Sequence, residues 1–206
     1  ISSRASRTVP SAPSEIVSMN EGLSTSSDTP SLATGAQLKA NSDRDDRFTS
    51  KTKAVTPRTV NDLTSGFKPA MYNTNTSTGS TSNLDADIPI IKNEELLLIR
   101  AEARWFTGNK AGALADLDLV RINSGGLAAT TLTAGSADAA FVTELRYNRT
   151  YSLLWEQGTR WLDARRFGGT AALPLDRAGD NIFPNMLVPA SECDARSLTV
   201  PCTPPT

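Results

Sequence analysis

The segment WEQGTRWLDARRFGG, residues 155–169, crowds two Trp, three Arg, one Glu and one Asp into a short stretch, and these side chain types could do chemistry. Its two carboxylates, Glu156 and Asp163, could work as an acid and a base if both faced one cleft and one had a raised pKa. Three arginines lie beside them in the sequence, and neighbouring guanidinium groups lower the pKa of a carboxylate. We therefore expect no catalytic residues in this segment.

Two non-catalytic roles remain for the same segment. Trp and Tyr rings stack on sugar rings while Arg and Asp bind hydroxyls, which would make a sugar-binding platform. Alternatively, the two Trp side chains flank a glycine turn and cover the junction of two helices, with Asp163 reaching Arg160 or Arg166 at helical spacing and Glu156 reaching an arginine. Aromatic side chains at helical spacing are more often core, so we favour the structural role. The residues assigned to it are Trp155, Glu156, Arg160, Trp161, Asp163 and Arg166.

The composition excludes several other kinds of site. The chain has 206 residues, no histidine and a formal charge of −1, so the usual general base is absent, most kinds of zinc site are excluded, and nothing favours nucleic acid. No metal or other cofactor is expected. Asn41, Asp43 and Asp45 alternate as in a calcium loop, but the glycine and distal glutamate of such a loop are missing, which indicates a solvated acidic turn.

The only two cysteines, Cys193 and Cys202, lie near the end of the chain. We expect a disulfide between them, worth about 2–3 kcal/mol by loop closure, and hence an oxidising, extracytoplasmic compartment. Two reduced thiols in a tail are the alternative. No apolar run approaches the roughly 20 residues that a membrane-spanning helix needs. Because the first residue is Ile, we expect a processed product or part of a longer protein.

Helical periodicity begins after residue 87 and predicts two helical hairpins. The first helix starts at Asn93 as N-cap and shows Leu96, Ile99, Ala103 and Phe106 on one face, and Gly108 ends it. Asn109 is predicted to cap the second helix, which ends near the Gly pair at 125–126. Alanines on both helices let them pack closely as an antiparallel hairpin. A third helix over about 138–155 and a short fourth over 159–167 form the second hairpin.

The rest of the chain is less regular. Residues 1–40 are rich in Ser and Thr and predict an extended arm without a core of its own. Residues 41–70 predict short strands or turns, with a β-segment on each side of Pro57. The chain is thus divided into the arm, a domain over 41–192 and a tail over 193–206. The fold predicted is mainly α, with tetratricopeptide-like helical hairpins, irregular loop and short-strand segments and an extended N-terminal arm.

Four motifs in this order resemble the C-terminal half of the SusD/RagB family. They are IRAEA at 99–103, GNKAGALADLDLVR at 108–121, EQGTRWLDARR at 156–166 and PASE at 189–192, and DDRF at 45–48 resembles an upstream segment of the family. The chain departs from the family in carrying Asn148 and Ser152 where glutamates are usual. It also lacks the lipid-bearing N-terminal cysteine and the first helical repeats.

The resemblance implies a surface lipoprotein of the outer membrane that binds glycans or peptides without chemistry. It implies a SusC-like TonB-dependent transporter as partner, for which such proteins act as a lid. No ligand-binding residue is singled out by the sequence. The alternative is a structural protein that self-assembles into a homo-oligomer, with the N-terminal arm contacting a neighbouring copy. What residues 1–40 touch distinguishes the two: contacts within the chain favour a binding module, and contacts with another copy favour assembly.

Overall fold

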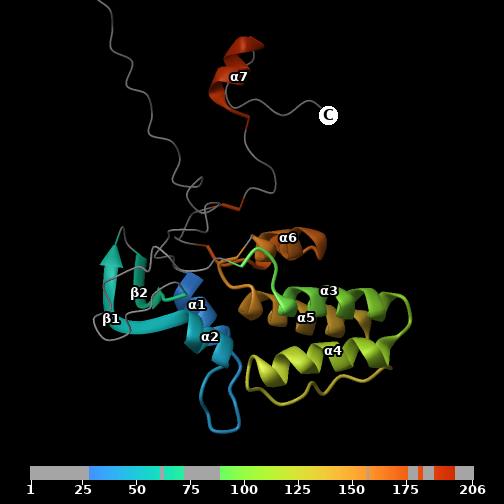
Figure 1. The fold of residues 1–206 in the computed structure, drawn as a ribbon. Helices are drawn as coiled ribbons and strands as arrows, with labels where there is room; N and C mark the ends of the chain where they lie inside the picture. The colour runs from blue at the N-terminus through green and yellow to red at the C-terminus, as the bar shows by residue number, and fades with distance from the viewer. Residues whose placement is uncertain are drawn as a thin grey trace, which may run out of the picture.

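The computed structural model describes residues 28–60, 63–71, 89–156, 158–175, 181–182 and 188–197 (Figure 1). Helices dominate and the sheet has only two strands, so the fold is mainly α, as predicted. The elements are α1 Asp28–Gly35, α2 Asp46–Lys51, β1 Thr52–Val60, β2 Leu63–Pro69, α3 Asn93–Phe106, α4 Lys110–Asn123, α5 Asp138–Ser152, α6 Thr159–Arg166, a 3-10 turn Thr170–Ala172 and α7 Ala190–Ala195.

Helices α3 and α4 form the predicted hairpin (Figure 1). Gly108 supplies the turn with a φ of 94°, and the Asn109 side chain accepts a hydrogen bond from the Gly112 N–H at 3.0 Å. Both features confirm the predicted stop and cap. The first helix differs at its start, because Lys92 and not Asn93 occupies the N-cap and makes no side-chain cap bond.

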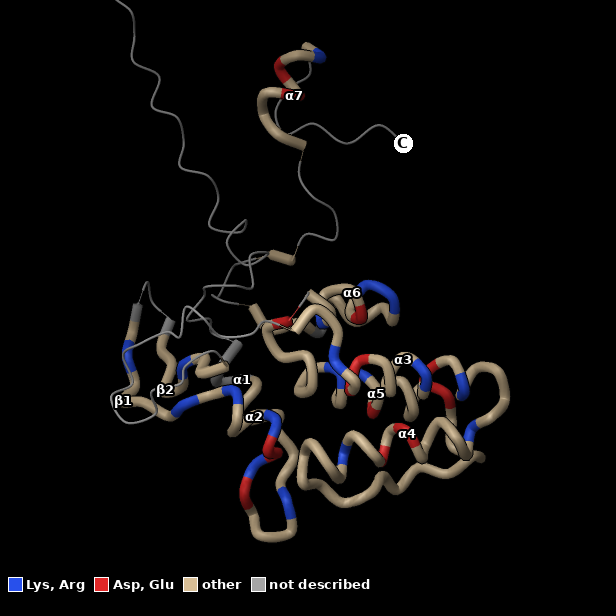
Figure 2. Tube along the Cα trace, viewed as in Figure 1, with Lys and Arg blue, Asp and Glu red and all other residues tan. Residues whose placement is uncertain are grey.

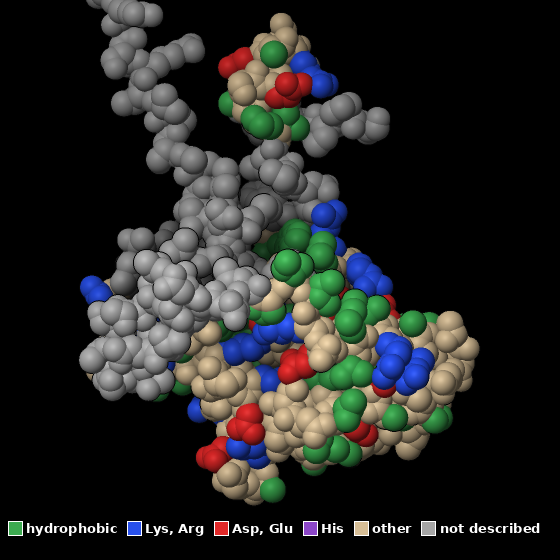
Figure 3. Space-filling view, viewed as in Figure 1, with side chains coloured by type: hydrophobic (Ala, Val, Ile, Leu, Met, Phe, Trp, Pro, Cys, Tyr) green, Lys and Arg blue, Asp and Glu red, His purple; other side chains and the backbone are tan. Residues whose placement is uncertain are grey.

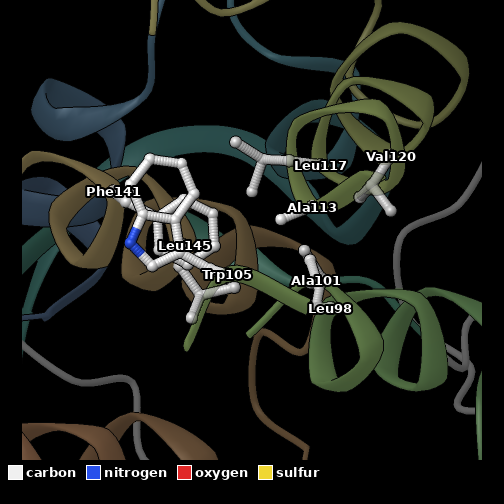
Figure 4. Close-up of a cluster of buried hydrophobic side chains, with 8 residues drawn as sticks. All are labelled: Leu98, Ala101, Trp105, Ala113, Leu117, Val120, Phe141 and Leu145. Carbon is white, nitrogen blue, oxygen red and sulfur yellow. The ribbon is translucent and has the colours of Figure 1, made fainter. Parts of the chain in front are cut away.

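The main core lies between α3, α4 and α5. Trp105 stacks on Phe141 with ring centroids 4.1 Å apart and planes 3° from parallel. Figure 4 shows side chains of all three helices pointing toward one another around these rings. Two alanines, Ala101 on α3 and Ala113 on α4, are fully buried, which lets the backbones approach closely as the sequence predicted. The core residues are Leu98, Ala101, Trp105, Ala113, Leu117, Val120, Phe141 and Leu145.

The face of α3 that the sequence predicted as apolar is not the buried one. Leu96, Ile99 and Phe106 are each about half exposed, at 53%, 50% and 54%, whereas Leu98 and Trp105 are buried. On the side of the molecule drawn in Figure 3, hydrophobic side chains gather over α3 and α6. Helix α3 is apolar on two faces, and periodicity alone does not say which of them meets α4 and α5.

Residues 28–40 lie against the helices and are not extended throughout. Residues 28–35 form α1, and Ala36, Leu32 and Ala33 are buried in a second cluster with Phe48 and Tyr151. The prediction of an extended segment is therefore wrong for 28–35, where isolated apolar residues in a polar sequence find partners far along the chain. Residues 1–27 and 198–206 lie outside the described residues, so the division into an arm, a domain and a tail stays a prediction.

Strands β1 and β2 pair antiparallel with Thr52 opposite Pro69 and Val60 opposite Leu63. The register shifts between Ala54 and Arg58, around Pro57. Proline has no N–H to donate, so an irregularity is expected at that point. The predicted β-segments on each side of Pro57 are two parts of one strand. Short α2 before β1 was not predicted, although Asp45 caps it by accepting from the Arg47 N–H.

Candidate functional site

A buried ion pair joins the N-terminal segment to helix α5. The Arg47 guanidinium donates to both Asp45 oxygens, at 2.9 and 2.6 Å, and both side chains are almost fully buried. The same guanidinium donates to Asn148 Oδ1 at 2.8 Å and to Ser152 Oγ at 3.2 Å. The sequence predicted a solvated acidic turn at Asn41, Asp43 and Asp45; the first two are exposed, but for Asp45 the prediction is wrong. Asp45 is withdrawn from water by Arg47.

The surroundings of Asn148 and Ser152 suit neutral side chains. Asn148 and Ser152 are neutral acceptors on a guanidinium that Asp45 already neutralises. Asn148 also donates to the Glu144 side chain at 2.9 Å, and Glu144 in turn is ion-paired with Arg121. A glutamate at position 148 would bring a second carboxylate against Glu144, which is costly where water is excluded.

Two tyrosines of α5 fix α1 against this network. Tyr147 donates its hydroxyl to Asp45 at 2.8 Å and accepts from the Gln37 N–H at 3.0 Å. Tyr151 donates to the Leu32 carbonyl at 2.7 Å. Burial raises the pKa of Tyr151 to about 12 and raises the pKa of Tyr147 further. Both hydroxyls therefore stay protonated donors at neutral pH.

Residues of the 155–169 segment lie in a second network, with α3 and α5. Asp163 accepts from Arg149 at 2.9 Å and lies 3.9 Å from Arg166, and Glu102 pairs with both of these arginines at 2.6 Å. The predicted contact of Asp163 with Arg166 is thus present, but the shorter partner, Arg149, was missed because it belongs to another helix. Figure 2 shows the two signs of charge interspersed along α3, α5 and α6.

Burial changes the electrostatics that the sequence predicted for this segment. Desolvation raises the pKa of Asp163 above its ordinary value, although Arg149 and Arg166 oppose the shift. The expectation that guanidinium groups lower the pKa of the carboxylates in this segment is therefore wrong for Asp163. It describes Glu102 instead, whose pKa is lowered by its hydrogen bonds to Arg166 and Arg149 despite the opposing effect of burial.

Glu156 pairs with lysines and not with the predicted arginine. Its carboxylate accepts from Lys51 Nζ at 3.2 Å and from Lys92 Nζ at 2.5 Å. Lys51 also donates to the Ser152 carbonyl at 2.5 Å. Burial lowers the pKa of Lys51, with Glu156 acting in the opposite direction. Glu156 thus connects the end of α2 to the residue that precedes α3.

The remaining residues of the predicted structural set lie around these pairs. Trp155 is half-buried, has a φ of 59° and packs against the second cluster, and Trp161 on α6 is half-buried as well. Arg160 lines a cavity together with Asp163. These positions are compatible with a structural role, which stays a prediction. Cys193 is buried in α7, whereas Cys202 lies outside the described residues, so the disulfide stays a prediction too.

A cavity of about 450 Å³ opens between α1, α5 and α6. Its size is within the range of small-ligand sites. Sequence reasoning singled out none of these positions as ligand-binding, because they come from segments more than 100 residues apart. The described residues that line it are Leu32, Gly35, Thr143, Arg146, Tyr147, Thr150, Tyr151, Arg160, Asp163, Leu173 and Pro174.

Arg146 lines the cavity without a counter-ion among the described residues. It is half-buried, and no described carboxylate forms an ion pair with it. Gly169 makes room for its guanidinium, since a Cβ on that glycine would lie 2.6 Å from Arg146 Nη2. Asp163 is the single carboxylate among the described lining residues, and Arg149 holds it. The cavity therefore offers a cation, hydroxyls and ring edges, which suits binding.

Among the described residues, no group of three or more His, Cys, Asp or Glu side chains is placed to hold a metal ion. Within the same residues, no helix combines the length and the apolar character needed to cross a bilayer.

The residues that line the cavity lie in a part of the chain that matches a known protein family. A sequence model described as the SusD family matches residues 22–191. No curated protein and no solved structure matches the chain. The match covers most of the chain and includes every described residue that lines the cavity.

Proposed function

Because the chain belongs to the SusD family, we propose that it is a non-catalytic module that binds a nutrient, glycan or peptide, at the cell surface. The cavity between α1, α5 and α6 is the proposed binding site. The observation that carries the proposal is the half-buried Arg146 in the wall of this cavity without an ionic partner among the described residues. A binding site for a polar nutrient needs such a free donor, whereas the neighbouring arginines on α5 and α6 that hold the fold are paired.

A role without chemistry is supported by the carboxylates near the cavity. General acid–base cleavage of a glycan uses two carboxyl groups that flank one bond. Of the two candidates in the 155–169 segment, Asp163 lines the cavity but is held by Arg149, and Glu156 is held by Lys51 and Lys92. Neither arrangement leaves a pair of carboxylates free to act on a substrate.

Family membership also supports the location and the partner that we propose. The chain would act on the extracellular face of the outer membrane as part of a lipid-anchored protein, together with a SusC-like TonB-dependent transporter. Co-purification of the intact protein with such a transporter from native membranes is the expected result. Recovery of the intact protein without any transporter would contradict this part of the proposal.

Ligand binding is tested on the purified chain with pools of oligosaccharides and of peptides, by calorimetry and chromatography. We expect binding in the micromolar to millimolar range and no change in the composition of either pool. Thr150→Trp fills the cavity and should abolish binding, whereas Thr131→Trp, on an exposed loop outside the cavity, should leave it unchanged. Binding that survives Thr150→Trp would exclude this cavity, and failure to bind either pool would exclude the function.

Self-assembly through the N-terminal arm is the alternative function. The described part of that arm contacts its own chain: Tyr151 donates to the Leu32 carbonyl, and Arg121 donates to Gln37 at 3.0 Å. These contacts within the chain favour the binding module. Light scattering tests the alternative directly, because a purified monomer would exclude it.

A further inference from the structure

We infer that the cavity between α1, α5 and α6 recognises an acidic saccharide, whose carboxylate group is held by Arg146. This inference deepens the proposed function, on which it rests, by naming the chemical class of the ligand.

Arg146 differs from three other arginines of α3, α4 and α5 that are buried or half-buried. Each of the others has a carboxylate or carbonyl partner in the fold, whereas Arg146 has none in the described residues and lies in the cavity wall. A half-buried guanidinium without a counter-ion has lost part of its hydration and gains nothing in return. A ligand anion would supply the missing partner. The paired arginines are Arg104, Arg121 and Arg149.

The charge balance of the wall favours an anion. Among the described lining residues, Asp163 is the one carboxylate, and Arg146 is a guanidinium that no described carboxylate pairs with. Arg149, which is not among the described lining residues, donates to that carboxylate at 2.9 Å and balances its charge. Because Arg149 balances Asp163, Arg146 is left as a positive charge without a counter-ion among the described residues. A planar carboxylate matches the fork of a guanidinium and can accept two parallel hydrogen bonds from it.

The rest of the wall favours a sugar as the carrier of the carboxylate. Thr143 and Thr150 contribute hydroxyl groups two turns apart on α5, and Tyr147 contributes part of an aromatic ring. Leu173 and Pro174 add apolar surface to the lining. A pyranose ring carries hydroxyls at its edge and C–H groups on its faces, so it makes use of both kinds of surface. The acidic sugar that combines these features is a uronate.

The test uses the purified full chain with trigalacturonate and with its methyl ester, in which each carboxylate is replaced by an uncharged methyl ester group. We expect trigalacturonate to bind in calorimetry, the ester to bind at least about tenfold more weakly, and salt to weaken the binding of the acid. Arg146→Gln should reduce the affinity for trigalacturonate by at least about tenfold. Arg165→Gln changes an exposed arginine of α6 outside the lining set and should not change the affinity.

Arg146→Lys keeps the charge but loses the planar fork, so an intermediate affinity is expected. Circular dichroism and urea unfolding of each variant separate a lost contact from a lost fold. Equal binding of the acid and the ester, or affinity that is unchanged in a folded Arg146→Gln variant, would overturn the inference. Binding of triglutamate in place of trigalacturonate would overturn its saccharide part.

The two proposals fail in different ways. If a neutral oligosaccharide or peptide from the pools binds and trigalacturonate does not, the inference about acidic saccharides is wrong while the binding function stands. If neither the pools nor trigalacturonate bind, both are wrong.

Discussion

At the scale of single residues, Arg47 is a buried charge whose guanidinium joins Asp45 to helix α5. It is 3% exposed, it meets Asp45 through two hydrogen bonds, and it reaches two residues of α5. Such a pair adds little stability over an apolar pair of the same shape, but loss of one partner leaves a charge buried without compensation. The energetic role of Arg47 is therefore visible only when its partner is removed.

We expect Asp45→Asn to destabilise the fold by about 3–5 kcal/mol, since Arg47 keeps its burial and loses its counter-charge. Arg196→Gln serves as the control: it removes the exposed ion pair with Glu192 on α7 and should cost no more than about 0.5 kcal/mol. Urea unfolding followed by circular dichroism measures both. Equal midpoints for the two variants would show that the buried pair contributes no more than a surface one.

At the scale of secondary structure, α3 shows how neighbours select one face of a helix with two apolar faces. Leu98, Ala101 and Trp105 meet α4 and α5, and Glu102 beside them meets Arg149 and Arg166. The stripe with Leu96 and Ile99 faces away from that core. The small size of Ala101 matters because α4 presents Ala113 in the same core. Close approach of the two helices depends on these alanines.

Ala101→Leu should therefore destabilise the chain by about 1–3 kcal/mol, because the added atoms have no space between α3 and α4. Ala103→Leu makes the same change on the exposed face of α3 and should stay within about 0.5 kcal/mol of the parent chain. Thermal unfolding of the two variants provides the comparison. A larger loss for Ala103→Leu would mean that the face predicted from periodicity is the buried one after all.

At the scale of the whole molecule, two clusters are joined by polar contacts between distant segments. The α3–α4–α5 core and the cluster around Phe48 share helix α5, and Arg47 and Lys51 connect α2 to its residues. Glu156 adds a third connection, because it holds Lys51 and Lys92 at one carboxylate that is 10% exposed. The cavity borders the shared helix α5, together with α1 and α6.

Glu156→Gln should weaken the docking of the sheet on the helices, since two partly buried lysines lose their shared counter-charge. We expect a loss of about 1–3 kcal/mol and faster amide exchange in β1 and β2 than in α3 and α4. Hydrogen exchange followed by mass spectrometry resolves these segments. Glu192→Gln, with an exposed carboxylate on α7, provides the matched control. Uniform acceleration across all elements would indicate global destabilisation and not loosened docking.

Local signals in the sequence were enough for most of the helices. Hydrophobic spacing placed α3 to α6, Gly108 and Asn109 placed the turn of the first hairpin, and both act through residues within a few positions of one another. The motifs at 99–121 and 156–166 also indicated the family that the comparison shows. Such features can be predicted because their physical causes are confined to one turn or one helix.

Partners that are distant in sequence needed the tertiary structure. The sequence predicts a solvated Asp45, and only the approach of α5 buries it with Arg47. The sequence also predicts an arginine as the partner of Glu156, whereas in the fold Glu156 forms ion pairs with Lys51 and Lys92. Arg146 carried no signal at all, since an arginine on a helix is ordinary until its surroundings show that it has no partner. Which charges are buried, paired or left for a ligand depends on distances between segments, and those distances exist only in the folded chain.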